Sequence, residues 1–179
     1  MAYSVVQGTT YSLWTLSMAD RTQTPLGVSS QQATNAVFSP NGRWIAYSVG
    51  ASGGDQSSSS GVLVKAFPAG PTFRAPKVGL DFHPVWASDT TLVYVGSAAT
   101  GELATVSVSE AGGLVFGAPV LLQARVTARR IASQARAYDI LPDGRFVGLV
   151  DESEPDGAPS RVGPVIRVVL NWFGELKSH

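Results

Sequence analysis

Short apolar segments, rich in valine, tyrosine, tryptophan and phenylalanine, alternate along this chain with stretches containing glycine, proline, serine and aspartate. Segments of this length and composition predict β-strands joined by turns. The outer strands are expected at 12–18, 62–67, 102–108 and 165–170. Only 171–177, at the end of the chain, could form a short helix. The pattern therefore predicts an all-β protein.

The apolar segments repeat. Ala2-Tyr3-Ser4-Val5 recurs as Ala46-Tyr47-Ser48-Val49, with looser copies at 92–95 and 146–149. Before three of these copies stands an apolar segment that ends in a turn, with Pro-Asn-Gly at 40–42 and Pro-Asp-Gly at 142–144. Proline presets φ, and glycine accepts a positive φ, so each such unit predicts two antiparallel strands. Large side chains recur at the end of the first strand, at spacings of 48 and 54 residues: Phe38, Trp86 and Ile140.

Spacings of this size are typical of β-propeller blades, each a sheet of four short strands. Residues 1–31 are expected to form three strands of a partial blade that lacks its innermost strand. Complete blades are expected at 32–80 and 81–128, and a partial last blade with a C-terminal cap at 129–179. The prediction is one partial propeller of three to four blades with about fourteen strands. The recurring large side chains should pack between neighbouring blades, and residues 50–61 and 151–163 should be exposed loops.

Thirteen basic and thirteen acidic residues balance, so the formal net charge is zero. This argues against nucleic acid as a partner, since its binding usually needs a basic excess. The chain has no cysteine. No apolar run reaches the length needed to span a membrane, and residues 1–7 do not resemble a signal peptide. The chain as it stands is therefore expected to be cytoplasmic, without membrane insertion.

FSPNGRWIAYSV, at 38–49, resembles the repeat of TolB-like, WD-type propellers. With LWTLSM before this segment and VLVKAFP, FGAPVLL and YDILPDGRF after it, the order resembles that of the C-terminal half of propellers fused to bacterial serine/threonine kinase-like proteins. The closing VVLNWFGEL, at 168–176, is the most specific part of this resemblance. The resemblance covers the whole chain and implies a sensor or interaction domain that follows a kinase domain and a membrane anchor.

A half-ring would expose apolar blade faces and strand edges. Closure of the ring by a second copy would cover them, so we expect a homo-oligomer, with a dimer as the simplest form. The other expectation is that the chain is a fragment whose function depends on a missing half.

Propellers commonly bind ligands at the mouth of the central channel, where the innermost strands begin. The repeat places five residues there: Thr34, Asn35, Phe82, His83 and Arg136. A peptide or a small molecule could bind at this mouth. Asp81 lies two residues before His83, and a histidine with carboxylates could hold a divalent metal. The metal-site candidates are therefore Asp81, His83 and Asp139.

Asp139 interrupts an apolar strand, where a carboxylate needs a partner or water. Arg136, Arg129 and Arg130 are its candidate partners, and a catalytic role shared with His83 is the alternative. The sequence holds no nucleophile elbow and no phosphate-binding loop. The tryptophans at 14, 44, 86 and 172 are expected in the core or the cap, and Arg125, Arg129 and Arg130 are expected on a solvated loop. His179, the last residue, is expected to have no role.

A complete repeat without a complete catalytic set favours a binding module or scaffold, and no cofactor is identifiable. The alternative is a promiscuous metal-dependent hydrolase of esters, lactones or phosphotriesters, with its site in a central channel shared between copies. That alternative rests on an analogy between folds, which is a weak basis for assigning a function.

Overall fold

The computed structural model describes residues 1–8, 10–30, 33–50, 60–97, 100–110, 112–126, 134–150 and 165–169. The described residues form β-strands, turns and bends and contain no helix, which confirms the predicted all-β class. Accordingly, this part of the chain has no helix of the length and apolarity that a membrane crossing would require. The helix expected at 171–177 lies outside the described residues.

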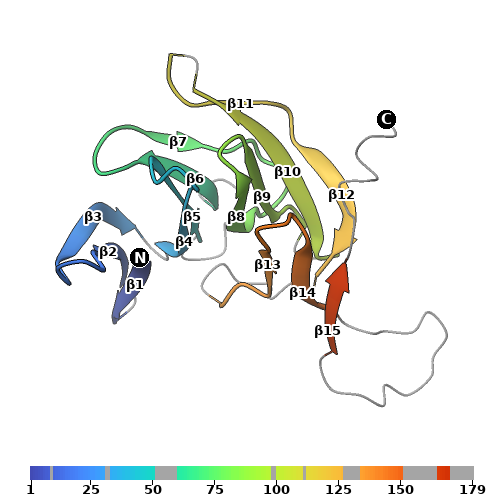
Figure 1. Ribbon diagram of the computed structural model, residues 1–179, viewed down its shortest axis with the longest axis horizontal. Helices are drawn as coiled ribbons and strands as arrows, with labels where there is room; N and C mark the ends of the chain where they lie inside the picture. Colours follow the sequence, from blue (N-terminus) through green and yellow to red (C-terminus); the bar gives the residue numbers. More distant parts are fainter. Residues whose placement is uncertain are drawn as a thin grey trace.

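The strands form four antiparallel sheets that follow one another along the chain, as in a partial propeller (Figure 1). The first sheet contains β1 (Ala2–Gln7), β2 (Thr10–Leu16) and β3 (Gln23–Ser30). The second contains β4 (Ala33–Phe38), β5 (Trp44–Val49), β6 (Gly61–Ala66) and β7 (Thr72–Arg74). The third contains β8 (Phe82–Ser88), β9 (Thr91–Val95), β10 (Glu102–Ser109), β11 (Val115–Phe116) and β12 (Val120–Arg125). The fourth contains β13 (Tyr138–Ile140), β14 (Phe146–Val150) and β15 (Val165–Val169).

The third sheet explains why the described residues hold fifteen strands rather than about fourteen. Both β11 and β12 pair with β10, and together they take the place of one outer strand. Gly117, Ala118 and Pro119 separate them. Proline has no amide hydrogen for the ladder, so a strand is readily interrupted there. A side chain at Gly117 would also collide with Ser107, because an added Cβ would lie 2.2 Å from its Oγ.

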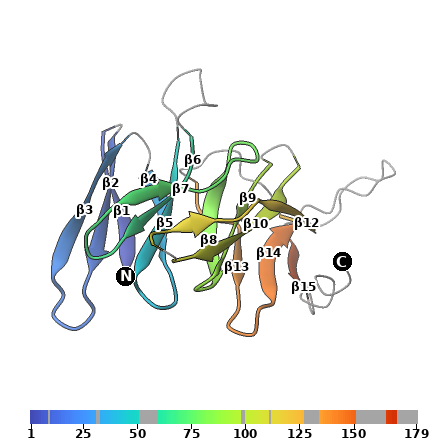
Figure 2. The same cartoon turned by 90° about the horizontal axis from the view of Figure 1, so that it is seen from above.

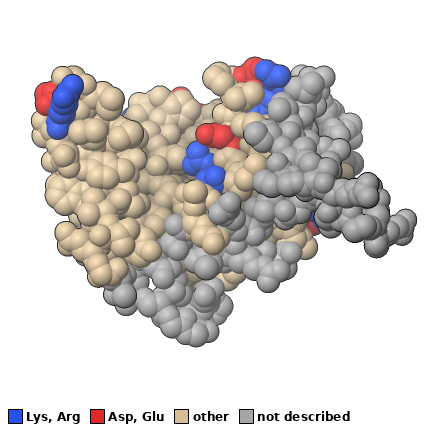
Figure 3. All heavy atoms as spheres, turned by 90° about the horizontal axis from the view of Figure 1, so that it is seen from below, with Lys and Arg blue, Asp and Glu red and all other residues tan. Residues whose placement is uncertain are grey.

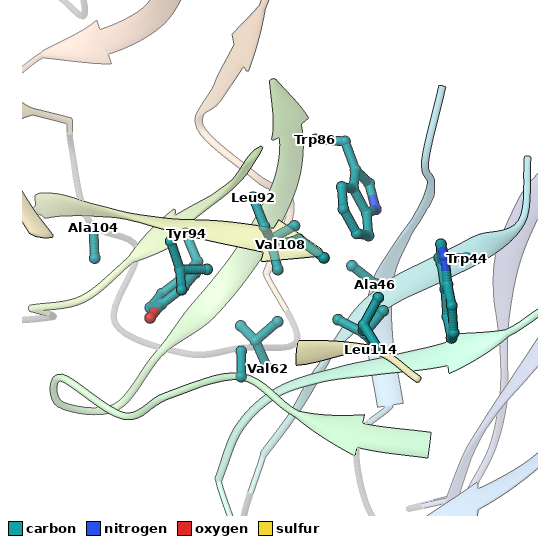
Figure 4. Packing of buried hydrophobic residues seen from close by; sticks show 12 residues of the cluster. Trp44, Ala46, Val62, Trp86, Leu92, Tyr94, Ala104, Val108 and Leu114 are labelled. Carbon is teal, nitrogen blue, oxygen red and sulfur yellow. The ribbon is translucent and has the colours of Figure 1, made fainter. Parts of the chain in front are cut away.

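Each pair of neighbouring sheets encloses one apolar cluster. Leu13 and Ile45 belong to the cluster between the first and second sheets. The cluster between the second and third sheets contains Trp44, Val62, Trp86 and Tyr94, among others (Figure 4). The third cluster joins the third and fourth sheets. As predicted, the recurring large side chains pack between sheets, one in each cluster: Phe38, Trp86 and Ile140.

Successive side chains of a strand point to opposite faces of its sheet. Ile45 and Tyr47 of β5 pack toward the first sheet, whereas Trp44 and Ala46 pack toward the third. In β9, Leu92 and Tyr94 pack toward the second sheet, and Val93 and Val95 toward the fourth. We call the face that meets the preceding sheet the backward face, and the face that meets the following sheet the forward face.

The pairing registers correct the repeat alignment by one residue. Phe38 pairs with Ile45, Trp86 with Leu92 and Ile140 with Phe146. Ile45, not Ala46, is therefore the counterpart of Leu92 and Phe146. The turn after Phe38 is one residue longer than the other two, a difference that the sequence comparison overlooked. A one-residue shift matters because it moves every side chain to the opposite face.

Asn41 and Asp143 shape equivalent turns between the first two strands of their sheets. The Asn41 Oδ1 accepts a hydrogen bond from the Arg43 amide at 3.0 Å, and the Asp143 Oδ1 accepts one from the Arg145 amide at 3.1 Å. Gly42 and Gly144 follow with φ of +70° and +85°, the left-handed region that favours glycine. These turns lie at the same end of their sheets, at the lower edge of Figure 2.

Candidate functional site

The innermost strands β4 and β8 begin in the same unusual way. Asn35 and His83 have φ of +53° and +57°, and each lies at an irregularity in the pairing with the next strand. Residues other than glycine seldom adopt this conformation, although asparagine and histidine tolerate it better than most. The repeat had aligned these two residues, and their matching conformation supports that alignment.

His83, in β8 of the third sheet, is 1% exposed and contacts both the second and the fourth sheets. Its amide donates a hydrogen bond of 2.8 Å to the Oγ of Ser48 in the second sheet. Its carbonyl accepts one of 2.7 Å from the hydroxyl of Tyr138 in the fourth sheet. The imidazole meets the Phe82 ring edge-on, with centroids 4.6 Å apart. In the described structure, the backbone of His83 therefore links three sheets.

Asp81 is 2% exposed, and its carboxylate caps the preceding turn. It accepts hydrogen bonds from the amides of Val78, at 3.1 Å to each oxygen, and of Gly79, at 3.0 Å. Burial raises the pKa of Asp81 above the ordinary carboxyl value, and the two amides and nearby cationic side chains oppose this shift only in part. These contacts give Asp81 a structural role in shaping the approach to β8.

Arg136 connects the third and fourth sheets. Its guanidinium donates hydrogen bonds to the carbonyl of Pro84 at 3.3 Å and to that of Tyr138 at 2.8 Å. It also pairs with the carboxylate of Asp139 at 3.1 Å, which confirms the partner predicted for this residue. The other two candidate partners, Arg129 and Arg130, lie outside the described residues.

The segment before β13 also reaches the second sheet. The side-chain amide of Asn35 donates a hydrogen bond of 2.9 Å to the carbonyl of Gln134. Gln134 and Arg136 thus bring the fourth sheet to the beginnings of both β4 and β8. The structure connects the candidates Asn35, His83 and Arg136 in one network, in which Thr34 and Phe82 are buried.

The structure does not gather the three metal-site candidates on a common exposed surface. Asp81 and His83 are buried, whereas the Asp139 side chain is 56% exposed and paired with Arg136. Among the described residues, no group of three histidine, cysteine, aspartate or glutamate side chains could hold a metal ion.

An open depression of about 280 Å³ lies on the fourth sheet. Its lining residues come from β14 and from β13 with the two residues before it: Arg136, Ala137, Tyr138, Asp139, Val147, Gly148 and Leu149. Phe146 and Tyr138 pack toward the third sheet, so the alternate residues Val147 and Leu149 belong to the forward face. The depression is therefore mostly apolar, and the Arg136–Asp139 ion pair is part of its lining.

The sequence points to Arg136 and Asp139 but does not single out Val147 or Leu149. The apolar segment at 146–149 was a signal for a buried strand, and no described element covers its forward face. Of the other predicted residues, Trp44 and Trp86 are buried in the core, and Trp14 is half-buried. Arg125 is exposed and pairs with Glu102 at 3.1 Å. Trp172 and His179 lie outside the described residues.

Charged side chains are sparse on the face shown in Figure 3. They lie in small groups in which lysine or arginine adjoins aspartate or glutamate, and most of the described surface in this view is uncharged. A mixed surface of this kind carries no extended field of one sign.

The fold defines the chain as an all-β, partial β-propeller. Comparison with known proteins adds no family: no family model matches the chain, and no curated protein sequence matches it. Among solved structures, the chain is similar to a puromycin-hydrolysing peptidase of Mycobacterium tuberculosis, with a TM-score of 0.41 and 12% identity. The match covers 83% of this chain and 35% of the peptidase chain, so it spans about a third of the length of that protein.

Proposed function

We propose that this chain is a protein-binding module and that the forward face of its fourth sheet is the binding surface. The observation that carries the proposal is the open depression of about 280 Å³, in which Val147 and Leu149 lie beside the Arg136–Asp139 ion pair. Apolar surface next to a few polar groups is typical of sites that bind another protein. The resemblance to TolB-like propellers is compatible with this proposal and remains a prediction.

The sheet packing supports the proposal. The forward faces of the first three sheets pack against a following sheet in apolar clusters. The fourth sheet has the same alternation, but no described element packs on its forward face. A partner that places apolar side chains there would continue the packing found in the rest of the molecule. The metal-dependent hydrolase remains an alternative prediction, and no specific feature of the described residues favours it.

Panning a displayed peptide library on the purified chain tests this function. Enriched peptides would be measured by fluorescence anisotropy against the wild type, Leu149→Arg and the control Leu121→Arg. Leu121 is 51% exposed on β12 and is not among the residues that line the depression. We expect Leu149→Arg to raise Kd at least tenfold and Leu121→Arg to leave it within about twofold. Peptides that bind all three proteins equally would show that the surface lies elsewhere.

A further inference from the structure

Two sheet faces at opposite ends of the molecule have no described neighbour. One is the forward face of the fourth sheet, with Val147 and Leu149. The other is the backward face of the first sheet, with Tyr3 and Trp14, which pair with each other in register. Leu13 adjoins Trp14 in the strand and packs toward the second sheet, so Tyr3 and Trp14 point the opposite way. A forward face and a backward face are the two surfaces that meet at each boundary between sheets.

Tyr3 has counterparts at two of these boundaries. Tyr47 of β5 pairs with Leu63, and Tyr94 of β9 pairs with Ala104, as Tyr3 of β1 pairs with Trp14. Tyr47 and Tyr94 are buried against the forward face of the preceding sheet. The first sheet thus presents the same aromatic residue on the same face, but only half-buried.

Charged residues at the two ends also match an internal contact. Between the second and third sheets, Arg43 pairs with Glu110 at 2.6 Å. Arg145 follows the Asp143-Gly144 turn as Arg43 follows the Asn41-Gly42 turn. In the pairing register Arg145 stands at the position of Trp44, whose Nε1 donates a hydrogen bond of 2.8 Å to the same Glu110. Glu110 lies six residues after Ala104, the partner of Tyr94, and Asp20 lies six residues after Trp14, the partner of Tyr3. Arg145 and Asp20 are therefore the corresponding opposite charges on the two ends.

We propose that the partner bound by the fourth sheet is a second copy of this chain, joined head to tail. Tyr3 and Trp14 of one copy pack on Val147 and Leu149 of the other, and Asp20 lies near Arg145. A two-fold axis makes two such junctions identical, which gives a dimer in which both ends of each chain are covered. This inference rests on the proposed function, because it names the partner of the same surface. Arg145 also pairs with Asp143 of its own chain through Nε, so the contact with Asp20 would extend a local ion pair.

Light scattering and sedimentation equilibrium across a concentration series test the proposal with the purified chain. We expect a dimer for the wild type. Arg145→Glu and Asp20→Arg should each raise the dimer Kd about tenfold, and the double variant should recover to within about threefold, because it restores opposite charges. Leu149→Asp should raise Kd at least a hundredfold, since it places a charge in the apolar contact. Arg125→Glu, at an exposed ion pair on β12, is the matched control and should leave Kd unchanged.

Circular dichroism and the thermal midpoint check that each variant is folded. The charge reversals at Asp20 and Arg145 lie in turns, so they keep the test valid even if Leu149→Asp fails to fold. A monomeric wild type at 100 µM would overturn the proposal, and so would a double variant as weak as the single ones. If the wild type is monomeric but Leu149→Arg still abolishes peptide binding, the proposed function holds and only the identity of the partner is wrong.

Discussion

Tyr138 offers a sharp test of how the fourth sheet is held to the third. Its hydroxyl is buried and donates a hydrogen bond of 2.7 Å to the carbonyl of His83, with a longer contact of 3.4 Å to that of Val93. Tyr138→Phe removes the hydroxyl and keeps the ring, so the cluster with Phe146 stays intact. The His83 carbonyl then loses this donor inside the protein.

Loss of one partner of a buried hydrogen bond costs about 1–3 kcal/mol of unfolding free energy. For a chain of this size, such a loss lowers the thermal midpoint by about 2–4 °C for each kcal/mol. Equilibrium unfolding in urea, at concentrations where the protein is monomeric, measures the free energy directly. The slope of the unfolding free energy against urea concentration should stay the same, because the surface exposed on unfolding is unchanged.

Tyr3→Phe is the matched control. The Tyr3 hydroxyl also makes one strong hydrogen bond, of 2.6 Å to the Oε1 of Gln23, but at an exposed site where water can replace it. We expect this variant to lose less than about 0.5 kcal/mol. Equal losses for Tyr138→Phe and Tyr3→Phe would refute the reasoning that burial makes the His83 contact important.

Three further predictions concern buried polar groups. Ser48→Ala should lower the unfolding free energy measured in urea by about 1–3 kcal/mol, because the His83 amide loses its acceptor. Ser4→Ala is the control and should lower it far less, because the Ser4 hydroxyl makes only a contact of 3.4 Å with the carbonyl of Ala33. Equal losses for the two variants would argue against the importance of the Ser48–His83 hydrogen bond. Burial raises the pKa of Tyr94 and Tyr138 above the ordinary value, so their contribution to the unfolding free energy should be complete below about pH 10 and decline as the pH rises above it. Tyr138→Phe should show a smaller decline of the unfolding free energy with pH, and a decline equal to that of the wild type would contradict this. The pKa of Asp81 is also raised in the folded state, so its contribution to stability should be present below about pH 4 and decline as the pH rises through the folded pKa. Asp81→Asn should remove that decline from the unfolding free energy measured between pH 3 and 7. Identical pH profiles for the variant and the wild type would exclude this contribution of Asp81.

Local sequence was sufficient to predict the strands and the packing of the large side chains. Alternation of apolar and polar positions, together with Pro-Asn-Gly and Pro-Asp-Gly turns, is a local property that does not depend on the rest of the chain. For the same reason, the sequence alone assigns Phe38, Trp86 and Ile140 to boundaries between sheets. The ion pair of Arg136 and Asp139 was also within reach, since only three positions separate them.

The tertiary structure decided what the polar residues do. Asp81 looked like a metal ligand beside His83, but the fold turns its carboxylate onto the amides of Val78 and Gly79. The contact between Asn35 and Gln134 joins positions 99 residues apart, a separation at which strand patterns carry no information on contacts.

The depression also depends on tertiary structure. Residues 146–149 are all apolar, and successive side chains of a strand point to opposite faces, so the sequence shows that β14 has two apolar faces. It does not show which of the two faces a neighbouring sheet covers. Sheet packing settles this, because the face of the fourth sheet that carries Phe146 and Tyr138 is buried against the third sheet, whereas the opposite face meets no described element. The sequence by itself therefore determined the strands and their repeat, whereas the meeting of distant sheets decided which side chains line the depression.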